Sequence, residues 1–487
     1  MPQYYYLVGD LSYLINKGEE LLMSLINKVK NQYYRFPKWL LNLGASVYYK
    51  IPEKYRYGSV FTDTIEYIRK NEYSSKEEIE KLIDINFVNT VKHAYYHVPF
   101  YNKLYDEHGV EIESINGVKD ICKLPFIDKD TIREHSSEMI ADGTSQGEMI
   151  YVTTSGSSGN PAGFYQPDSI TMEEWVYTVE IWGRVGYKPD SSRLVLRGKK
   201  LHPASGDKNF FYDPLRKELS CNIFDMRDET MAVYCSAIEQ YKPEFIHGYM
   251  SAIIILAKYI ERNNIVLKHQ FKAILATSEN VVEEQKNYVE KTFRARVFSF
   301  YGHSERLVIA GECEKCSDYH VEPLYGYCEI LDKNGDEANE GEVVATGFLN
   351  NIMPLIRYKT GDIARWSPDQ NCSCGRFYRR IEKVIGRWHQ DMLVNLNGAY
   401  VSLTALNIHS NEFDRVVRYK IVQYEKGHVD ILLQVDKSFS SSDATNIKEL
   451  LESKTNGKII FNVQIVEQIA TLKNGKYSII EQHIETK

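Results

Sequence analysis

Residues 151–165, YVTTSGSSGNPAGFY, have the composition of a loop that holds phosphate. The stretch lies between a β-rich segment and a chain that turns helical. Its hydroxyl side chains can donate hydrogen bonds to anionic oxygens, and its glycines let backbone N–H groups approach a polyphosphate without a Cβ in the way. We therefore expect a nucleotide to bind at Thr154, Ser155, Gly156, Ser157, Ser158 and Gly159.

The spacing differs from that of the ordinary P-loop, which needs a Gly, four residues and then Gly-Lys-Ser/Thr. Asn160 follows Gly159 here, and no lysine comes directly after it. A Ser/Gly-rich run is also typical of flexible surface linkers. The phosphate-loop interpretation therefore depends on motifs further along the chain.

Four later motifs follow this stretch in a fixed order: YGHSE at 301–305, RYKTGD at 357–362, GR at 386–387 and NGK at 474–476. Each is weak alone, but the order is that of an adenylate-forming enzyme. The chain resembles the phenylacetate-CoA ligase-like family of that superfamily, and most closely its branch associated with capsular polysaccharide biosynthesis. HVPFY at 97–101 and LPFIDK at 124–129 also carry the resemblance, which covers residue 81 to Lys476.

The resemblance implies an ATP-dependent carboxylate ligase. A substrate carboxylate would attack the α-phosphorus of ATP, leaving an acyl-adenylate and pyrophosphate. Transfers of this type depend on positioning and charge neutralisation more than on covalent help from the protein. The acyl group would then pass to the thiol of CoA, to a carrier thiol or to an amine, and the sequence leaves the acceptor open.

The resemblance also assigns nucleotide contacts. Glu305 would hold Mg²⁺, a hard cation that takes carboxylate and phosphate oxygens. Tyr301, followed by Gly302, would lie against the adenine, and Ser278 and Glu279 would line the other side of the base. A surface role for Glu305 and a core role for Tyr301 are the alternatives.

Three more residues complete the implied charge set. Asp362 would accept hydrogen bonds from both ribose hydroxyls, although an Asp in a turn can merely satisfy its own backbone. Arg387 would contact the nucleotide near the domain boundary. Lys476 would bridge the carboxylate and the α-phosphate, because a compact ammonium can touch both anions. In simpler ligases an acidic residue lies closer to the Gly-Arg than Asp391 does here, so the hinge residue stays open.

Four of the eight cysteines form two close pairs, Cys313 with Cys316 and Cys372 with Cys374. Cysteines of a cytoplasmic chain are not expected to form a disulfide framework, and paired thiolates at this spacing suit tetrahedral Zn²⁺. His320 lies close enough in sequence to replace Cys316, so both a four-cysteine set and a Cys₃His set stay open. Four protein ligands leave no position for water, which indicates structural zinc that braces the loops around Asp362. Four reduced thiols in ordinary loops are the alternative.

Length and composition predict a two-domain α/β protein. At 487 residues the chain exceeds the size at which one core usually stops growing. Its 43% hydrophobic and 26% charged residues are those of an ordinary globular protein. We expect an N-terminal helical extension at 1–80, a large adenylate-forming domain with mostly parallel sheets at 81–386, and a small α+β lid at 387–487. The family implies that the lid rotates after adenylation.

Apolar runs of strand length alternate with helical patterns in the large domain, which predicts parallel pairing. The predicted strands cover 194–196, 245–247, 273–276 and 297–300, and the predicted helices cover 76–96, 173–186, 252–263 and 282–292. In the lid we expect strands at 418–423, 429–435 and 459–466 and a helix at 444–454.

The net charge of −7 and the lack of a long basic run argue against a nucleic-acid partner. Neither a secretory signal nor an apolar window of about twenty residues is visible, which predicts a cytoplasmic protein without a transmembrane segment. Residues 21–57 mix apolar and basic side chains, a pattern typical of a helical pair packed on the main domain or of peripheral membrane contact. A homodimer is the commonest closed assembly, but the sequence does not reveal the oligomeric state.

The acid pocket is the least defined part of the prediction. Family analogy places it among residues 201–250 and just before Tyr301, with His202, Phe211, His247 and Tyr249 as candidates. Three functions stay open: a ligase of surface-polysaccharide assembly, an aryl-CoA ligase of aromatic acid metabolism, and a non-catalytic nucleotide-binding pathway protein. The presence of all four charged residues, Glu305, Asp362, Arg387 and Lys476, favours an enzyme.

Overall fold

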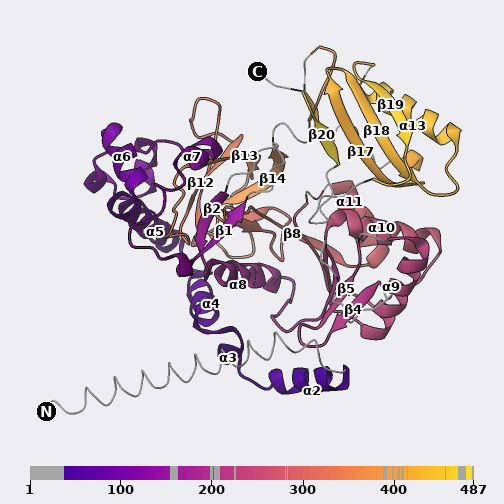
Figure 1. The fold of residues 1–487 in the computed structure, drawn as a ribbon, viewed down its shortest axis with the longest axis horizontal. Helices are drawn as coiled ribbons and strands as arrows, with labels where there is room; N and C mark the ends of the chain where they lie inside the picture. Colours follow the sequence, from indigo (N-terminus) through magenta and orange to yellow (C-terminus); the bar gives the residue numbers. More distant parts are fainter. Residues whose placement is uncertain are drawn as a thin grey trace.

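The computed structural model describes most of the chain (Figure 1). The described residues are 38–153, 163–197, 201, 209–223, 226–279, 281, 283–387, 392–397, 400–402, 406, 411–413, 415–455, 457–469 and 479–484. The predicted phosphate loop at 154–159 and the predicted site residues Asp391, His202 and Lys476 lie outside these ranges.

A twelve-stranded sheet forms the centre of the large domain. In spatial order its strands are β11 (Gly326–Leu331), β12 (Glu340–Gly347), β13 (Tyr358–Trp366), β14 (Arg380–Arg387), β10 (Tyr319–Val321), β9 (Ile309–Gly311), β8 (Arg296–Gly302), β7 (Ala273–Ala276), β6 (Phe245–Gly248), β3 (Arg193–Leu196), β5 (Glu218–Cys221) and β4 (Phe210–Asp213).

The α/β class is confirmed, but the expectation of mostly parallel pairing needs a correction. The ladders from β5 through β3, β6 and β7 to β8 are parallel. The ladders from β8 to β11, and the one that adds β4, are antiparallel. Parallel neighbours need a crossover of a dozen or more residues, and the chain after β8 makes its connections without crossover helices.

Helices cover both faces of the parallel strands. Side chains alternate across a strand, so Ile274 packs with α9 (Asp228–Tyr241), α10 (Met250–Arg262) and α11 (Glu283–Phe293), whereas the next residue, Leu275, packs with α4 (Ser59–Asn71) and α8 (Ile170–Gly183). The predicted strands are β3, β6, β7 and β8, and the predicted helices are α5 (Lys76–His97), α8, α10 and α11. These predictions are confirmed to within a few residues at each end.

The antiparallel half packs against α5, α6 (Pro99–Glu107) and α7 (Lys129–His135) in a separate core cluster. Ser75 and Glu78 form a capping box that starts α5. Residue 80, where we expected the N-terminal extension to end, lies inside α5. Phe61 and Ile68 of α4 are buried against α8, so the described part of the extension packs on the large domain. The domain boundaries themselves stay a proposal.

Shorter elements complete the large domain. They are α2 (Lys38–Tyr48), α3 (Glu53–Tyr57), the hairpin strands β1 (Met149–Thr153) and β2 (Gly163–Pro167), and the 3₁₀ helices η1 (Ile112–Ser114), η2 (Val118–Lys123) and η3 (Gln146–Glu148).

The lid is a small α+β domain, as predicted. Its sheet has the order β19-β18-β17-β20, and α13 packs on it. These elements are β17 (Val416–Glu425), β18 (His428–Val435), α13 (Ser441–Lys454), β19 (Ile460–Ile465) and β20 (Ile480–Gln482), preceded by β15 (Met392–Val394), β16 (Tyr400–Ser402) and η5 (Asn411–Phe413).

The lid lies over the end of the large domain that carries α10 and α11 (Figure 1). Lys258 of α10 donates hydrogen bonds from Nζ to the carbonyl oxygens of Phe413 and Val416, at 3.3 and 2.7 Å. Arg418 of β17 donates to the carbonyl oxygen of Ile223, at 3.3 Å. All three hydrogen bonds run from a cationic side chain of one domain to a backbone carbonyl of the other. No described helix has the length and apolarity that crossing a bilayer requires.

One buried ion pair ties the N-terminal helices to the antiparallel strands. Arg357 and Glu329 are 4% and 6% exposed, and the guanidinium Nη2 lies 2.9 Å from Glu329 Oε1. Arg357 Nη1 also donates to the carbonyl oxygen of Leu124, at 2.9 Å. The ring of Phe126 lies 4.0 Å from the guanidinium carbon. The LPFIDK and RYKTGD motifs therefore meet through this arginine.

Arg357→Met should lower the free energy of unfolding by about 3 kcal/mol, because removing one member of a buried pair leaves Glu329 as an uncompensated buried charge. Chemical denaturation followed by circular dichroism measures the change. Arg365→Met is the matched control: its pair with Glu340 is exposed, so its effect should stay below about 1 kcal/mol. Equal effects of the two variants would contradict the prediction.

Candidate active site

The candidate site lies at the carboxyl end of β8, where the sheet changes from parallel to antiparallel pairing. Residues 296–299 of β8 pair with β7, and residues 300–302 pair with β9. Ligands of open α/β sheets bind outside the carboxyl ends of the strands at such a change of direction. Tyr249, Thr277 and Tyr301 stand at or just after the ends of β6, β7 and β8.

Tyr301 and Asp362, predicted from separate motifs, are in direct contact. The Tyr301 hydroxyl donates a hydrogen bond to Asp362 Oδ2 at 2.8 Å. Burial and the charge of Asp362 raise the pKa of Tyr301 well above its ordinary value, so the hydroxyl keeps its proton. Asp362 on β13 also stands directly opposite Arg387 on β14. The structure therefore brings these three residues together.

Glu305 lies in the turn that follows β8 and is 4% exposed. Its Oε1 accepts a hydrogen bond from the Tyr358 hydroxyl at 3.1 Å. Among the residues that the structure describes, no lysine, arginine or histidine forms an ion pair with it. A buried carboxylate without a cation is costly, so this position suits a bound cation.

The turn is attached to the strand that leaves the predicted phosphate loop. Gln166 of β2 is fully buried and donates from Nε2 to the carbonyl oxygens of Ser304 and Glu305, at 3.3 and 3.4 Å. Its Oε1 accepts from Arg306, whose Nε donates to Glu174 at 2.7 Å. Since β1 and β2 pair from Met149 to Thr153 on one strand and Gly163 to Pro167 on the other, Gln166 attaches the hairpin that carries residues 154–162 to the Glu305 turn.

Ser278 and Glu279 follow β7, as expected for a wall of the site. Ser278 has a left-handed backbone with φ of 64°. Both oxygens of Glu279 accept hydrogen bonds from Ser251, one from the backbone N–H and one from the hydroxyl, each at 2.9 Å. Glu279 thus anchors the first turn of α10, and its place beside the base stays a prediction.

The predicted metal ligands also converge. The Sγ atoms of Cys313, Cys316 and Cys372 are separated by 3.6, 3.7 and 3.7 Å, and Cys374 Sγ lies 3.4 Å from His320 Nε2. Thiolates around a tetrahedral ion with bonds of about 2.3 Å lie about 3.8 Å apart, whereas a disulfide requires about 2.05 Å. The ligand atoms of Cys313, His320, Cys372 and Cys374 all lie within 4.8 Å of one another. The four cysteines and His320 therefore have the donor atoms and the spacing for one four-coordinate ion, which leaves one thiol that is not a ligand.

His320 is poised as a neutral ligand. Burial and the nearby charge of Arg184 lower its pKa to about 4, so the imidazole is uncharged at neutral pH. Its Nδ1 lies 3.3 Å from the carbonyl oxygen of Asp318, the kind of second contact that orients ligating histidines.

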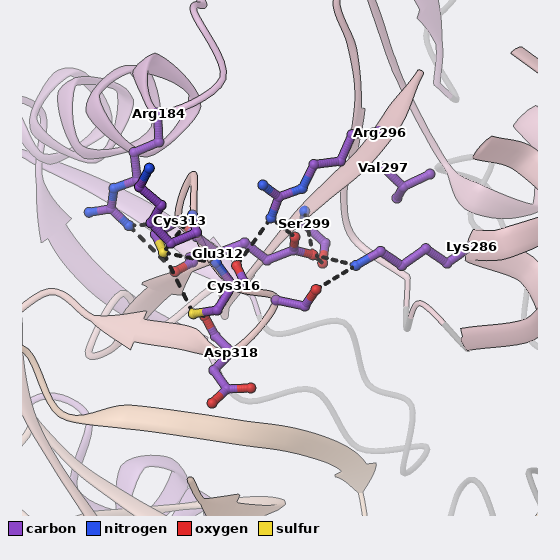
Figure 2. Close-up of polar contacts among 12 residues, drawn as sticks. Arg184, Lys286, Arg296, Val297, Ser299, Glu312, Cys313, Cys316 and Asp318 are labelled. Atoms are coloured by element: carbon purple, nitrogen blue, oxygen red, sulfur yellow. Dashed lines mark hydrogen bonds and ion pairs between the residues drawn. The ribbon is translucent and has the colours of Figure 1, made fainter. Parts of the chain in front are cut away.

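A buried carboxylate holds the cysteine loop on the sheet, as Figure 2 shows. Glu312 is 2% exposed, and its oxygens lie 3.4 Å from Lys286 Nζ and 2.8 Å from Arg296 Nη2. Glu312 also accepts from the Ser299 hydroxyl at 2.9 Å, and Arg296 donates to the carbonyl oxygen of Cys316 at 3.1 Å. The network links α11 and β8 to the loop that starts at Cys313.

Sequence reasoning missed several of these supports. Tyr358 lies within the RYKTGD motif, so the sequence did indicate that this segment contributes to the site. Gln166 and Glu312 carry no local signal, because their partners lie far away in the sequence.

Of the proposed pocket residues, His247 packs edge to face on Trp182 with ring centroids 4.8 Å apart. Phe211 lies on the outermost strand β4, remote from β8.

Comparisons with known proteins show similarity of sequence and fold. The family described as the CapK C-terminal domain matches residues 393–483. Protein CapK of Staphylococcus aureus is 24% identical over 453 residues, which cover 91% of this chain and 97% of that protein. Phenylacetate-coenzyme A ligase of Pseudomonas putida is 26% identical over 360 residues, covering 70% of this chain and 77% of that protein.

Among solved structures, the chain is similar to 2-hydroxyisobutyryl-CoA ligase in the postadenylation state in complex with R3-HIB-AMP. The TM-score is 0.66 at 17% identity, and the match covers 85% of this chain and 91% of that chain. Fold, motifs and relatives now agree. The chain is similar to CapK and to phenylacetate-coenzyme A ligase over most of its length, and it has the fold of an adenylate-forming CoA ligase. These similarities support an enzyme of the AMP-forming ligase class.

Glu305→Gln should raise the stability of the ligand-free protein by on the order of 1 kcal/mol, because it removes a buried charge that has no described cation. Thermal unfolding in EDTA, without nucleotide, measures the change. Glu329→Gln is the control, since it weakens the pair with Arg357 and should lower stability. A loss of stability in Glu305→Gln as large as in the control would show that Glu305 has a structural cation partner.

Proposed function

We propose that the chain activates a carboxylic acid with ATP at the carboxyl end of β8 and transfers the acyl group from the resulting acyl-adenylate to an acceptor. The observation that carries this proposal is the hydrogen bond between Tyr301 and Asp362, opposite Arg387 and next to a buried Glu305 with no described cation. A nucleoside monophosphate offers ribose hydroxyls to Asp362 and negative charge to Arg387, and Mg²⁺ offers a positive charge to Glu305.

Each residue has a defined task in the proposed reaction. Asp362, oriented by the Tyr301 hydroxyl, accepts hydrogen bonds from the ribose. Glu305 would hold Mg²⁺, which would supply positive charge for the phosphates of ATP. Arg387 and Lys476 stabilise negative charge at the α-phosphate, and residues 154–159 bind the outer phosphates. Gln166 couples these parts, because it joins the strand after that loop to the Glu305 turn.

The relatives guide the choice of acceptor. Those compared above include proteins named as CoA ligases and one named CapK. We propose that CoA is the acceptor and that the product serves capsular or surface polysaccharide assembly in the cytoplasm, where free thiols and ATP coexist. An aryl-CoA ligase of aromatic acid metabolism is the second candidate, supported by the match to phenylacetate-coenzyme A ligase.

We further propose that Cys313, Cys372, Cys374 and His320 hold a structural Zn²⁺. The neutral imidazole and the compact ligand group support this set. Arg380 donates a hydrogen bond to Cys316 Sγ at 3.4 Å, which gives the fifth donor a partner of its own. With four protein ligands the ion has no open position, so it braces the loop that Glu312 attaches to β8 and takes no part in the reaction.

The function is tested by measuring pyrophosphate release with ATP, Mg²⁺ and a panel of aryl acids, fatty acids, amino acids and uronic acids. CoA or hydroxylamine serves as acceptor. We expect release that depends on one class of acid and increases with CoA. Release with hydroxylamine but not with CoA would favour an amine acceptor. Bound ATP with no release for any acid would contradict the ligase and favour a non-catalytic nucleotide-binding protein.

Lys476→Ala should lower acid-dependent exchange between pyrophosphate and ATP by at least about a hundredfold, because its ammonium is needed where charge gathers between two anions. ATP affinity should change by less than about threefold, which equilibrium binding measures. The exposed Lys437→Ala is the control and should behave like the unaltered chain. Retained exchange in Lys476→Ala would contradict the assigned role.

Elemental analysis of the purified chain should find about one zinc per chain. Cys372→Ser should lose the metal, Cys316→Ser should keep it, and Cys122→Ser, remote in sequence from the cluster, is the control. Loss of zinc from Cys316→Ser together with retention in His320→Ala would replace the Cys₃His set with four cysteines. Zinc absent from correctly folded protein would refute the site.

A further inference from the structure

His303 lies between Tyr301 and Glu305 in the site, and its ring nitrogens have no described hydrogen-bond partner. It occupies the turn after β8, two residues beyond Tyr301 and two before Glu305. Both ring nitrogens, Nδ1 and Nε2, are inaccessible to solvent and form no hydrogen bond with any described residue. The ring packs edge to face on Tyr301, with centroids 5.8 Å apart and an interplanar angle of 84°.

The backbone of the turn holds His303 in this position. Its carbonyl oxygen accepts a hydrogen bond from the Arg306 N–H at 3.0 Å, and Gln166 holds the next two carbonyls. Leaving a buried polar group unsatisfied costs about 1–3 kcal/mol. An imidazole with two such atoms, in a turn held by these hydrogen bonds, therefore needs a partner that the described residues do not supply.

The order of residues along the turn indicates which ligand atom meets the ring. Tyr301 contacts Asp362, on the proposed ribose side, and Glu305 occupies the proposed cation and phosphate side. The position between ribose and outer phosphates is the α-phosphate, where the substrate carboxylate attacks. A neutral imidazole always carries one N–H donor, and a carboxylate oxygen is a strong acceptor.

We propose that His303 binds the carboxylate of the acid substrate through a ring N–H and orients it toward the α-phosphorus. The inference rests on the proposed function and adds a positioning residue to it. The proposal also explains why this position holds a polar ring, although an apolar side chain would make the ligand-free protein more stable.

The test compares His303→Leu, similar in volume but without donors, with His303→Gln, which keeps an N–H donor. The assay is exchange between pyrophosphate and ATP, using the acid that gives the strongest pyrophosphate release. We expect His303→Leu to raise KM for the acid about ten- to a hundredfold, the loss of a hydrogen bond to a charged group. KM for ATP and the Kd of AMP should change less than about twofold, and His303→Gln should recover part of the loss.

Thermal unfolding without ligands separates positioning from a structural role. His303→Leu should unfold at the same temperature as the unaltered chain or higher, since it removes unsatisfied polar atoms. His428→Leu, at an exposed position of the lid, is the control for replacing a histidine.

Three results would overturn the inference. An unchanged KM for the acid in His303→Leu would show that the ring does not contact the carboxylate. A parallel loss of AMP affinity would assign the ring to the phosphate instead. A lowered unfolding temperature with no recovery in His303→Gln would assign it to the fold. Failure of the proposed function looks different, because the unaltered chain would then show no acid-dependent exchange.

Discussion

Strand β8 must pair in two different ways along its length, and the arrangement of the site depends on this constraint. Its first residues are locked between helical layers by parallel pairing with β7. Its last three residues pair only on the β9 side. The strand end is therefore rigid yet open on one edge, so Tyr301 can reach across to Asp362 on β13 while the following turn carries His303 and Glu305. A site built on strand ends is held more precisely than one built on loops alone.

The buried charged side chains that support the fold are paired with opposite charges, whereas the buried carboxylate in the site has no described cation. Arg357 with Glu329, and Glu312 with Lys286 and Arg296, are buried and paired, and each pair joins segments distant in sequence. The Glu305 side chain is as buried as these carboxylates, but the only hydrogen bond described for its carboxylate comes from the Tyr358 hydroxyl. The supporting pairs join distant segments of the fold, whereas the proposed function assigns ligand atoms as partners of the incompletely paired polar groups.

Local signals predicted some of this organisation well. The apolar run 273–276 became β7 residue for residue, because a short run of this kind between helices has few alternatives to a buried strand. The close cysteine pairs, together with His320, predicted the donor cluster. The family resemblance predicted separate nucleotide contacts for Tyr301 and Asp362, but not the hydrogen bond between them, which joins residues sixty-one positions apart.

Other features depend on tertiary contacts that no local pattern encodes. The antiparallel half of the sheet escaped prediction because its strands follow one another without the helical crossovers that reveal pairing. Gln166 is an unremarkable residue in sequence, yet it joins β2 to the Glu305 turn. The Glu279 carboxylate is engaged by Ser251 at the start of α10, a role that neither its position after β7 nor the resemblance indicates.

The central claim is that a carboxylate oxygen attacks the α-phosphorus of ATP at this site. It is tested most directly by supplying the preferred acid with its carboxylate labelled with ¹⁸O and analysing AMP and pyrophosphate by mass spectrometry after turnover. Attack at the α-phosphorus leaves one carboxylate oxygen on the phosphate after acyl transfer, so the account predicts one ¹⁸O per AMP and none in pyrophosphate. Unlabelled AMP, or label released as inorganic phosphate, would contradict it, because the acid would then have been activated without an acyl-adenylate.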